Sequence, residues 1–387
     1  MSWARLRYGL VAALVALLAL NSAPPPGRGK AFQAVIPPTP AASPRSAAVP
    51  GLDAFIPVAE QFVSSHRGLD YTSPVQVTLL DDAAFQERVA ADVRSSASDF
   101  DKEGKVLTAL GLVPAGTDLE QTEESFVRAG VLGYYDPHSK QLVVRGGQLT
   151  VSVRHVLVHE LTHALQDQHF DLSKRPSADD ESDLAYTGLV EGDAVTVENA
   201  YIASLSPVDR AELRREEAAS IPDFSSVPMA LIEIDLFPYQ YGPMFVQTLL
   251  ARKGQAGLDA AFQSPPTTSA QLIHPALYLD GRGASDVASP SPSGTVLDRG
   301  VIGEMGFNIL LRQLMANGGL TAAAARQAAA EWQGDRYVAF RSNDSTCVRD
   351  SVAGGADLHS ALVKLAASRS GMTVADEAGG FSFTSCG

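Results

Sequence analysis

One segment of this 387-residue chain constrains its fold more than any other, because it combines the pattern of a buried helix with charged side chains. In residues 151–168 apolar positions recur three or four apart, which is the spacing of a helix packed inside a protein. Within this range stands the run HELTH at 159–163, the pattern HExxH. Burying two imidazoles and a carboxylate is costly unless a metal ion or another partner satisfies them. The segment therefore predicts a core helix built around a metal site.

The spacing of this pattern suits metal-assisted hydrolysis. On a helix, residues four apart lie one turn above each other, so His159 and His163 can reach one ion while Glu160, about 100° around the axis, flanks it. A carboxylate there can take a proton from a metal-bound water, whose pKa the ion lowers toward about 7. We expect His159 and His163 to bind Zn²⁺ and Glu160 to act as the general base. His155 extends the histidine stripe, and we expect it at the surface or behind a ligand.

Two residues compete for the place of the third ligand. His169 lies six residues after His163, as in the HExxHxxGxxH motif, but that motif needs a sharp turn and Gln166, a good helix former, stands where its glycine would be. Glu191, on a separate downstream segment, would complete a set of two imidazoles and one carboxylate with one position open for water. We therefore expect Glu191 to bind the metal, with a more distant carboxylate such as Glu304 as the alternative.

Two runs of sequence carry a family resemblance, HELTHALQDQHF at 159–170 and LVEGDA at 189–194. They resemble gluzincin-type zinc metallopeptidases, and most closely exported bacterial proteins of that class, as segments 237–245, 265–275 and 334–337 also do. The resemblance implies an α+β, mostly helical fold, in which a small sheet with a hairpin lies beside the HExxH active-site helix and a helical lobe follows. It also implies Zn²⁺ as the cofactor, Glu191 as a ligand, and a peptide or protein as the substrate.

The chain departs from this family at one position. Familiar gluzincins place an aspartate four residues after the ligand glutamate, where it orients a ligand histidine, and here that position is Val195. The role must then fall to another residue. Asp193, Asp167 and Glu198 are the candidates, each against the alternative of an ordinary charge on a helix surface.

Hydrolysis of a peptide bond also needs a hydrogen-bond donor aimed at the developing oxyanion. Tyr239, Tyr241 and His274 are the residues that the sequence offers, each against the alternative of a packed aromatic or a turn histidine. The family resemblance favours Tyr241 and His274, so these two join Glu160 as the expected catalytic residues.

The first residues predict export. Two arginines precede an apolar run over 10–20, and small residues follow, which is the order of a secretory signal. The run is shorter than the roughly 20 residues that span a bilayer. We expect a cleaved signal peptide over 1–23 and an extracytoplasmic protein, secreted or associated with the cell envelope; an uncleaved segment that tethers the chain to a membrane is the alternative. Residues 24–50, rich in Pro, Ala and Ser, predict a disordered linker.

The folded part divides, by its pattern, into two regions. We expect a metallopeptidase-like catalytic domain over 51–285 and a C-terminal helical lobe over 295–387, separated by a stretch rich in Ser, Pro and Gly. Cys347 and Cys386 both fall in the second region, and an oxidising compartment favours a disulfide between them over two free thiols.

In the first region we expect a helix through residues 55–66, a strand over 75–80 and a hairpin over 131–144. A second helix over 184–205 is interrupted, in this pattern, by two glycines, and an apolar helix follows Tyr241. The hairpin could offer a free edge to an extended peptide, or it could be structural with a covered edge.

These observations define the candidate functions. The net charge of −14 argues against a nucleic-acid partner, because such binding rests on a basic surface. The leading hypothesis is an exported zinc peptidase; the alternatives are a catalytically silent binding or assembly module on a gluzincin scaffold, and a zinc hydrolase acting on a non-peptide bond. The intact Glu160 favours catalysis, because a silent module has no need for that carboxylate.

Overall fold

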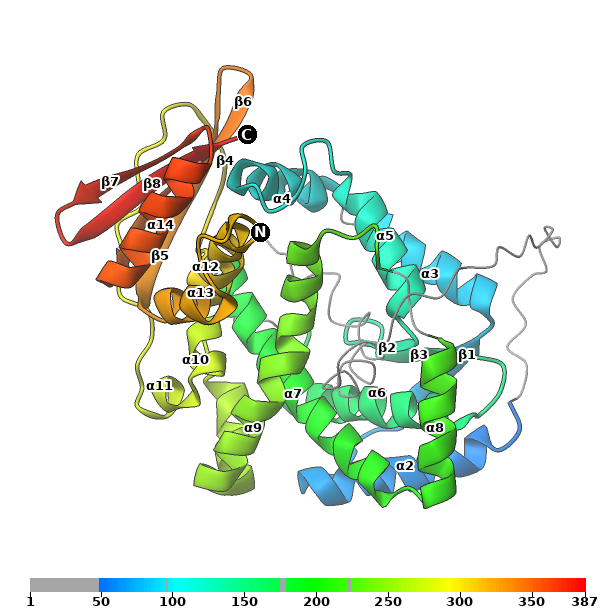
Figure 1. The fold of residues 1–387 in the computed structure, drawn as a ribbon. Helices are drawn as coiled ribbons and strands as arrows, with labels where there is room; N and C mark the ends of the chain where they lie inside the picture. The colour runs from blue at the N-terminus through cyan, green and yellow to red at the C-terminus, as the bar shows by residue number, and fades with distance from the viewer. Residues whose placement is uncertain (1–48, 95–96, 175–178, 221–223) are drawn as a thin grey trace.

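The computed structural model describes residues 49–94, 97–174, 179–220 and 224–387 (Figure 1). The described residues are 58% helical and form two small sheets, so the expected α+β, mostly helical class is confirmed. The expected signal peptide and nearly all of the expected linker lie outside the described residues. Within the described ranges, none of the helices combines the length and the hydropathy of a membrane-spanning segment.

The first elements build a small three-stranded sheet with helices around it. Its strands are ordered β1-β3-β2, with β1 parallel and β2 antiparallel to the central β3, so the expected hairpin is present and β2 is an edge strand. The elements of this part are α2 (Leu52–Arg67), β1 (Gln76–Leu80), α3 (Asp82–Arg94), α4 (Ala97–Leu110), α5 (Leu119–Gly130), β2 (Gly133–Asp136) and β3 (Gln141–Arg145).

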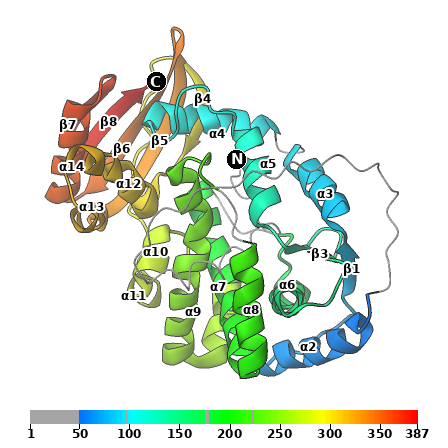
Figure 2. The same cartoon turned by 45° about the vertical axis from the view of Figure 1, so that its right-hand side comes forward.

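Helix α6 (Val151–Phe170) runs through the middle of this part. The Thr150 side chain caps its first turn by accepting the Val153 N–H, and the helix ends at Asp171, which has a φ of 52°. Figure 2 shows α6 nearly end-on, with the hairpin, α2, α7 and α8 around it, and each of these elements packs against it. Apolar residues on all sides of α6 are therefore buried, as the sequence pattern predicts.

Helices α7 (Asp180–Ser204) and α9 (Met229–Gln263) cross at very short range. A Cβ atom on Gly192 would lie 2.2 Å from the Gly242 carbonyl carbon, and one on Gly242 would lie 2.1 Å from the Gly188 oxygen. The prediction that the glycines interrupt α7 is wrong. The helix is continuous, and the glycines let a second backbone approach it. The short α8 (Pro207–Ala219) lies between the two in sequence.

Helix α9 also differs from its prediction in extent. Tyr239 and Tyr241 lie inside it instead of before it, and its axis breaks at Gly254, where φ is 66° and ψ is −169°. Two short helices follow, α10 (Ser269–Ile273) and α11 (Pro275–Leu279).

The C-terminal region is not the helical lobe that the sequence predicts. It holds a five-stranded antiparallel sheet, ordered β4-β5-β6-β8-β7, with helices packed on it (Figure 1). The strands of this sheet mix apolar with polar residues, so their sequences carry only a weak local pattern for strands. The helical periodicity of α12 and α14 is stronger, and it leads to the prediction of a helical lobe. The elements are β4 (Thr295–Gly300), α12 (Gly303–Arg312), a 3-10 helix (Gln313–Asn317), α13 (Ala322–Ala329), β5 (Trp332–Ser342), β6 (Ser345–Gly354), α14 (Ala356–Ser368), β7 (Met372–Glu377) and β8 (Gly380–Cys386).

The two regions are held together by contacts that cross the expected domain boundary. Helix α4, from the first region, packs against β6 and β8, and its Val106 and Leu110 belong to the apolar core of the second. The Ser385 hydroxyl donates to the Ala109 carbonyl at 2.6 Å. The expected disulfide between Cys347 and Cys386 is present and joins β6 to β8.

Candidate metal centre

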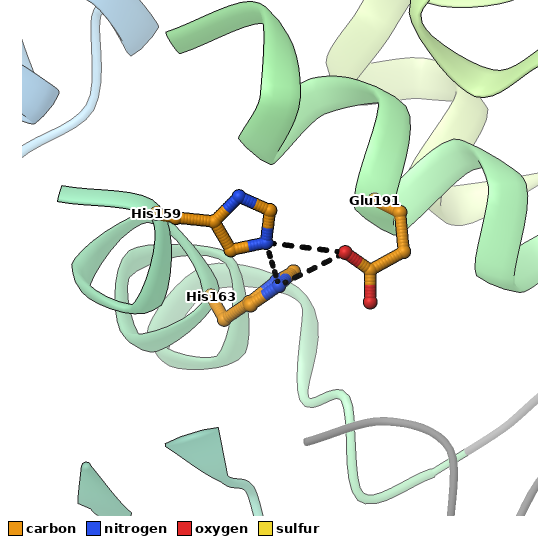
Figure 3. A group of neighbouring side chains, drawn as sticks. All are labelled: His159, His163 and Glu191. Atoms are coloured by element: carbon orange, nitrogen blue, oxygen red, sulfur yellow. Dashed lines mark hydrogen bonds and ion pairs between the residues drawn. The ribbon is translucent and has the colours of Figure 1, made fainter. Parts of the chain in front are cut away.

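Two neighbouring helices bring His159, His163 and Glu191 together. The imidazoles project from successive turns of α6, and Glu191 reaches them from α7 (Figure 3). The Glu191 Oε2 atom lies 3.2 Å from the His159 Nε2 atom and 3.3 Å from that of His163, and the two Nε2 atoms are 3.0 Å apart. All three side chains are buried, with at most 3% of each exposed.

This geometry fits one small cation. In a tetrahedral site with bonds of about 2.0–2.1 Å, ligand atoms lie about 3.3 Å apart, close to the three separations seen here. Two imidazoles and one carboxylate also leave a fourth position for water or substrate. This buried His/His/Glu cluster could therefore hold a metal ion.

The three side chains of the cluster shift one another's pKa values. Burial alone would raise the pKa of Glu191, but His163 and His159 hold it at about 2. Burial would lower the pKa of both histidines, but carboxylates outweigh it and raise the pKa of each: Glu191 and Glu198 do so at His159, and chiefly Glu191 at His163. The carboxylate is thus ionised at neutral pH and supplies the negative charge that a divalent cation would meet.

Glu160 lies beside the cluster without belonging to it. Its side chain is fully buried, and neither oxygen makes a hydrogen bond of good geometry within the part of the chain that the structure describes. Burial raises the pKa of this carboxyl to about 7, against the opposing effects of His159, His163 and the Tyr135 N–H. A buried carboxylate with this pKa could exchange a proton near neutral pH.

His159 is oriented by Glu198. This carboxylate contacts the ligand histidine from behind, as an aspartate at position 195 would be expected to do and Val195 cannot. The Glu198 Oε2 atom lies 2.8 Å from the His159 Nδ1 atom, on the side of the ring opposite Glu191. Glu198 is buried and not a surface charge, and it follows Glu191 by two helical turns on the same face of α7. His155 is also buried, 3.5 Å from the other Glu198 oxygen, so of its two expected places the surface is wrong and the position behind a ligand agrees with the structure.

His163 is oriented by a longer chain of polar groups. Its Nδ1 atom lies 2.9 Å from the Gln166 side-chain oxygen, and the Gln166 amide donates to Asp193 at 2.9 Å. The buried Arg67 donates to the same Asp193 oxygen at 2.7 Å and to Asp259 at 3.0 Å. The candidate Asp193 therefore acts on the histidine through Gln166, for which the sequence pattern predicts only a place in the helix.

Among the residues that the structure describes, Asp167 forms its hydrogen bonds with groups other than the two ligand histidines. It accepts hydrogen bonds from the Tyr135 hydroxyl and the Lys140 ammonium, both at 2.7 Å, and from the Leu172 N–H at 3.0 Å. This carboxylate ties the hairpin to the end of α6. It therefore has a structural place next to the site instead of the orienting role considered for it.

The structure brings Tyr239 to the cluster in preference to the other two candidate donors. The Tyr239 hydroxyl hydrogen-bonds Glu191, and burial together with that carboxylate raises its pKa well above the usual value, so it stays protonated. Tyr241 instead stacks on Phe237 with ring centroids 4.8 Å apart. His274 pairs with Glu304 at 2.9 Å. In the described residues neither Tyr241 nor His274 contacts the cluster, so their catalytic role stays a prediction.

The competing third ligands lie elsewhere. The His169 Nε2 atom lies 2.8 Å from the Asp70 carbonyl, near the exposed end of α6. Glu304 is engaged with His274 on α12. Only Glu191 among the three stands within reach of both ligand histidines in the part of the chain described.

Comparison with known proteins adds nothing to this geometry, because no protein-family model, no curated protein and no solved structure matches the chain.

Proposed function

We propose that this protein is a zinc-dependent hydrolase that acts on peptide bonds outside the cytoplasm. The observation that carries the proposal is a buried carboxylate without good hydrogen bonds, Glu160, beside a His/His/Glu cluster whose spacing suits a small cation. A metal site with only a structural role has no need for such a group. Zinc is the proposed ion because it favours two imidazoles and one carboxylate with an open position. The disulfide supports an oxidising compartment.

The residues around the cluster have separate roles in this proposal. Bound zinc would lower the pKa of a water molecule at the open position and polarise the substrate carbonyl. Glu160 takes the proton from the attacking water and delivers it to the leaving amine. The Tyr239 hydroxyl has a single O–H, which donates to Glu191 in this structure; in the proposal it turns from that carboxylate toward the oxygen on which negative charge develops. Glu198 and Gln166 hold the two imidazoles in the orientation that presents their Nε2 atoms.

The edge strand β2 is the proposed place for the substrate backbone. In the described sheet β2 pairs only with β3, so its other edge is free of strand partners. The Tyr135 N–H on this strand acts on the Glu160 carboxylate, which puts the strand next to the proposed general base. An extended peptide paired with β2 would therefore bring its backbone to the site without a requirement on sequence.

The decisive test compares the wild type with Glu160→Gln. We expect both proteins to bind about one zinc ion, measured by mass spectrometry of metals, because Glu160 is not a ligand. Hydrolysis of an unfolded protein should fall about a hundredfold to ten-thousandfold in Glu160→Gln. Glu123→Gln, which removes another buried carboxylate on α5, should keep full activity. A wild type that binds zinc and cleaves no peptide would instead support the silent binding module.

A further inference from the structure

A cavity lies between the two regions of the chain, bordered by α4, α7, α9 and α12. Its volume is about 100 Å³, and its walls are mainly aliphatic. The walls include Leu107 from α4, Leu184 from α7, Ile234 from α9, and Met305 and Ile309 from α12. Since α12 belongs to the C-terminal region, this cavity depends on how the two regions pack together.

The cavity begins next to the metal centre. Tyr239 lines it and also hydrogen-bonds Glu191 with its hydroxyl. On α7, Leu184 and Thr187 line it, and with Glu191 they follow the i, i+3, i+7 spacing that puts residues on one helix face. With a rise of 1.5 Å per residue, Thr187 lies about 6 Å from Glu191 along the axis. The cavity and the metal centre are therefore close neighbours, with Tyr239 between them.

The size and chemistry of the cavity select its occupant. A water molecule needs about 10–15 Å³ of such volume, so the space holds roughly seven to ten water-sized groups, comparable with a leucine or phenylalanine side chain. This is too little for a long acyl chain. Three carboxyl groups also line the cavity and disfavour an anion. Asp180 and Glu181 lie near the start of α7, at the end away from Glu191, and the buried Asp235 lies on α9, one turn before Tyr239.

We propose that this cavity receives the aliphatic or aromatic side chain of a substrate residue next to the cleaved bond. The inference rests on the proposed peptide hydrolysis and adds to it a substrate class. The C-terminal region then has a direct part in substrate choice, because Met305 and Ile309 form one wall of the cavity. Burying such a side chain is favourable enough to set a preference of roughly tenfold or more between an apolar residue and alanine.

The test narrows the cavity from two sides. Ile309→Phe adds bulk from α12, and Leu112→Phe adds it from the segment after α4, where the residue is only partly buried. Ile232→Phe is the matched control, because this partly buried residue of α9 does not line the cavity. Zinc-loaded full-length proteins are given a mixed peptide pool, cleavage sites are mapped, and kcat/KM is measured for matched peptides with Phe, Leu, Ala or Lys at the preferred position. Thermal melts confirm that each variant is folded.

We expect the wild type to prefer Phe or Leu at one position beside the cleaved bond. In Ile309→Phe and Leu112→Phe this preference over Ala should fall roughly tenfold or more, with Ala peptides cleaved as before, and Ile232→Phe should match the wild type. Cleavage with no apolar preference, a preference for Lys, or a preference that survives both variants would overturn the inference and leave the hydrolase standing.

If the wild type cleaves nothing, the proposed function fails and a binding measurement decides on the cavity. The probe is N-acetyl-phenylalaninamide, compared with N-acetyl-glycinamide by NMR titration. Shifts that occur only with the phenylalanine compound and disappear in Ile309→Phe support an apolar side-chain site. Equal or absent shifts with the two compounds overturn it.

Discussion

Each ligand histidine is held from behind by a different partner. His159 meets the charged Glu198, and His163 meets the neutral Gln166, whose amide in turn rests on Asp193. A carboxylate partner makes an imidazole a stronger ligand than an amide does. The two histidines are therefore unequal, with His159 the more basic of the pair.

The third ligand allows a sharp comparison between two substitutions. Glu191→Ala should weaken zinc binding by orders of magnitude, because it removes both a ligand atom and the negative charge of the cluster. His169→Ala should leave the affinity nearly unchanged, because that ring contacts the Asp70 carbonyl. Competitive zinc titration of the two purified variants measures the difference. The reverse order of effects would assign the third ligand to His169.

Part of the site could be predicted from local spacing alone. The two histidines and Glu160 follow from four-residue periodicity on one helix, and the structure places Glu191 beside them. Glu198 and Tyr239 could not be selected in the same way, because their nearness to the site depends on how α6, α7 and α9 cross. Neighbouring tyrosines on α9 point about 200° apart, so a choice between Tyr239 and Tyr241 needs the packing of that helix.

At the scale of elements, the crossing of α7 and α9 positions Glu191. Gly192→Ala would force a Cβ atom against the Gly242 backbone, where no side chain can move aside. We expect the free energy of unfolding to fall by about 1–3 kcal/mol and zinc affinity to drop with it. Chemical denaturation and zinc titration measure the two effects. Gly147→Ala, where a Cβ atom would meet nothing within 4 Å, is the matched control. Equal behaviour of the two variants would contradict a role for close helix approach.

Some helices and strands could be predicted from residues close together in the sequence, and others could not. Helix α6 and the β2-β3 hairpin could be predicted, because periodicity and turn residues lie within about twenty positions. The five-stranded sheet could not, because its strands carry polar residues on the side that faces solvent and are stabilised by pairing across the sheet. The role of the α7 glycines could not be predicted either, because they allow close approach of a helix that lies fifty residues away in the sequence.

At the scale of the whole molecule, buried carboxyl groups at the junction of the two regions predict a pH dependence of stability. Glu181 on α7 accepts two hydrogen bonds from Ser269, and Asp335 on β5 accepts the Ile302 and Gly303 N–H groups. Burial raises the pKa of Glu181 to about 8 and that of Asp335 to about 6. In the unfolded chain both groups titrate near pH 4.

The sign of the effect follows from these values. Between about pH 4 and pH 8 the folded protein binds more protons than the unfolded chain, so stability falls as the pH rises through 6 and 8. We expect a lower melting temperature at pH 8 than at pH 5 for the metal-free protein, measured by calorimetry. Glu181→Gln should flatten this slope above pH 6, whereas Glu120→Gln on the partly exposed start of α5 should not. A slope that is unchanged in Glu181→Gln would contradict the assignment.

The attachment of α4 to the C-terminal sheet has a consequence for the order in which the molecule assembles. The Ser385 to Ala109 hydrogen bond joins residues 276 positions apart, and Val106 and Leu110 of α4 belong to the apolar core of the C-terminal region. Contacts between such distant residues form slowly, because a long loop must close before they stabilise anything. In an emerging chain this side of α4 therefore lacks its native partners until the last strands have been synthesised. The cavity between the regions, and any selectivity that it confers, is consequently among the last features of the molecule to form.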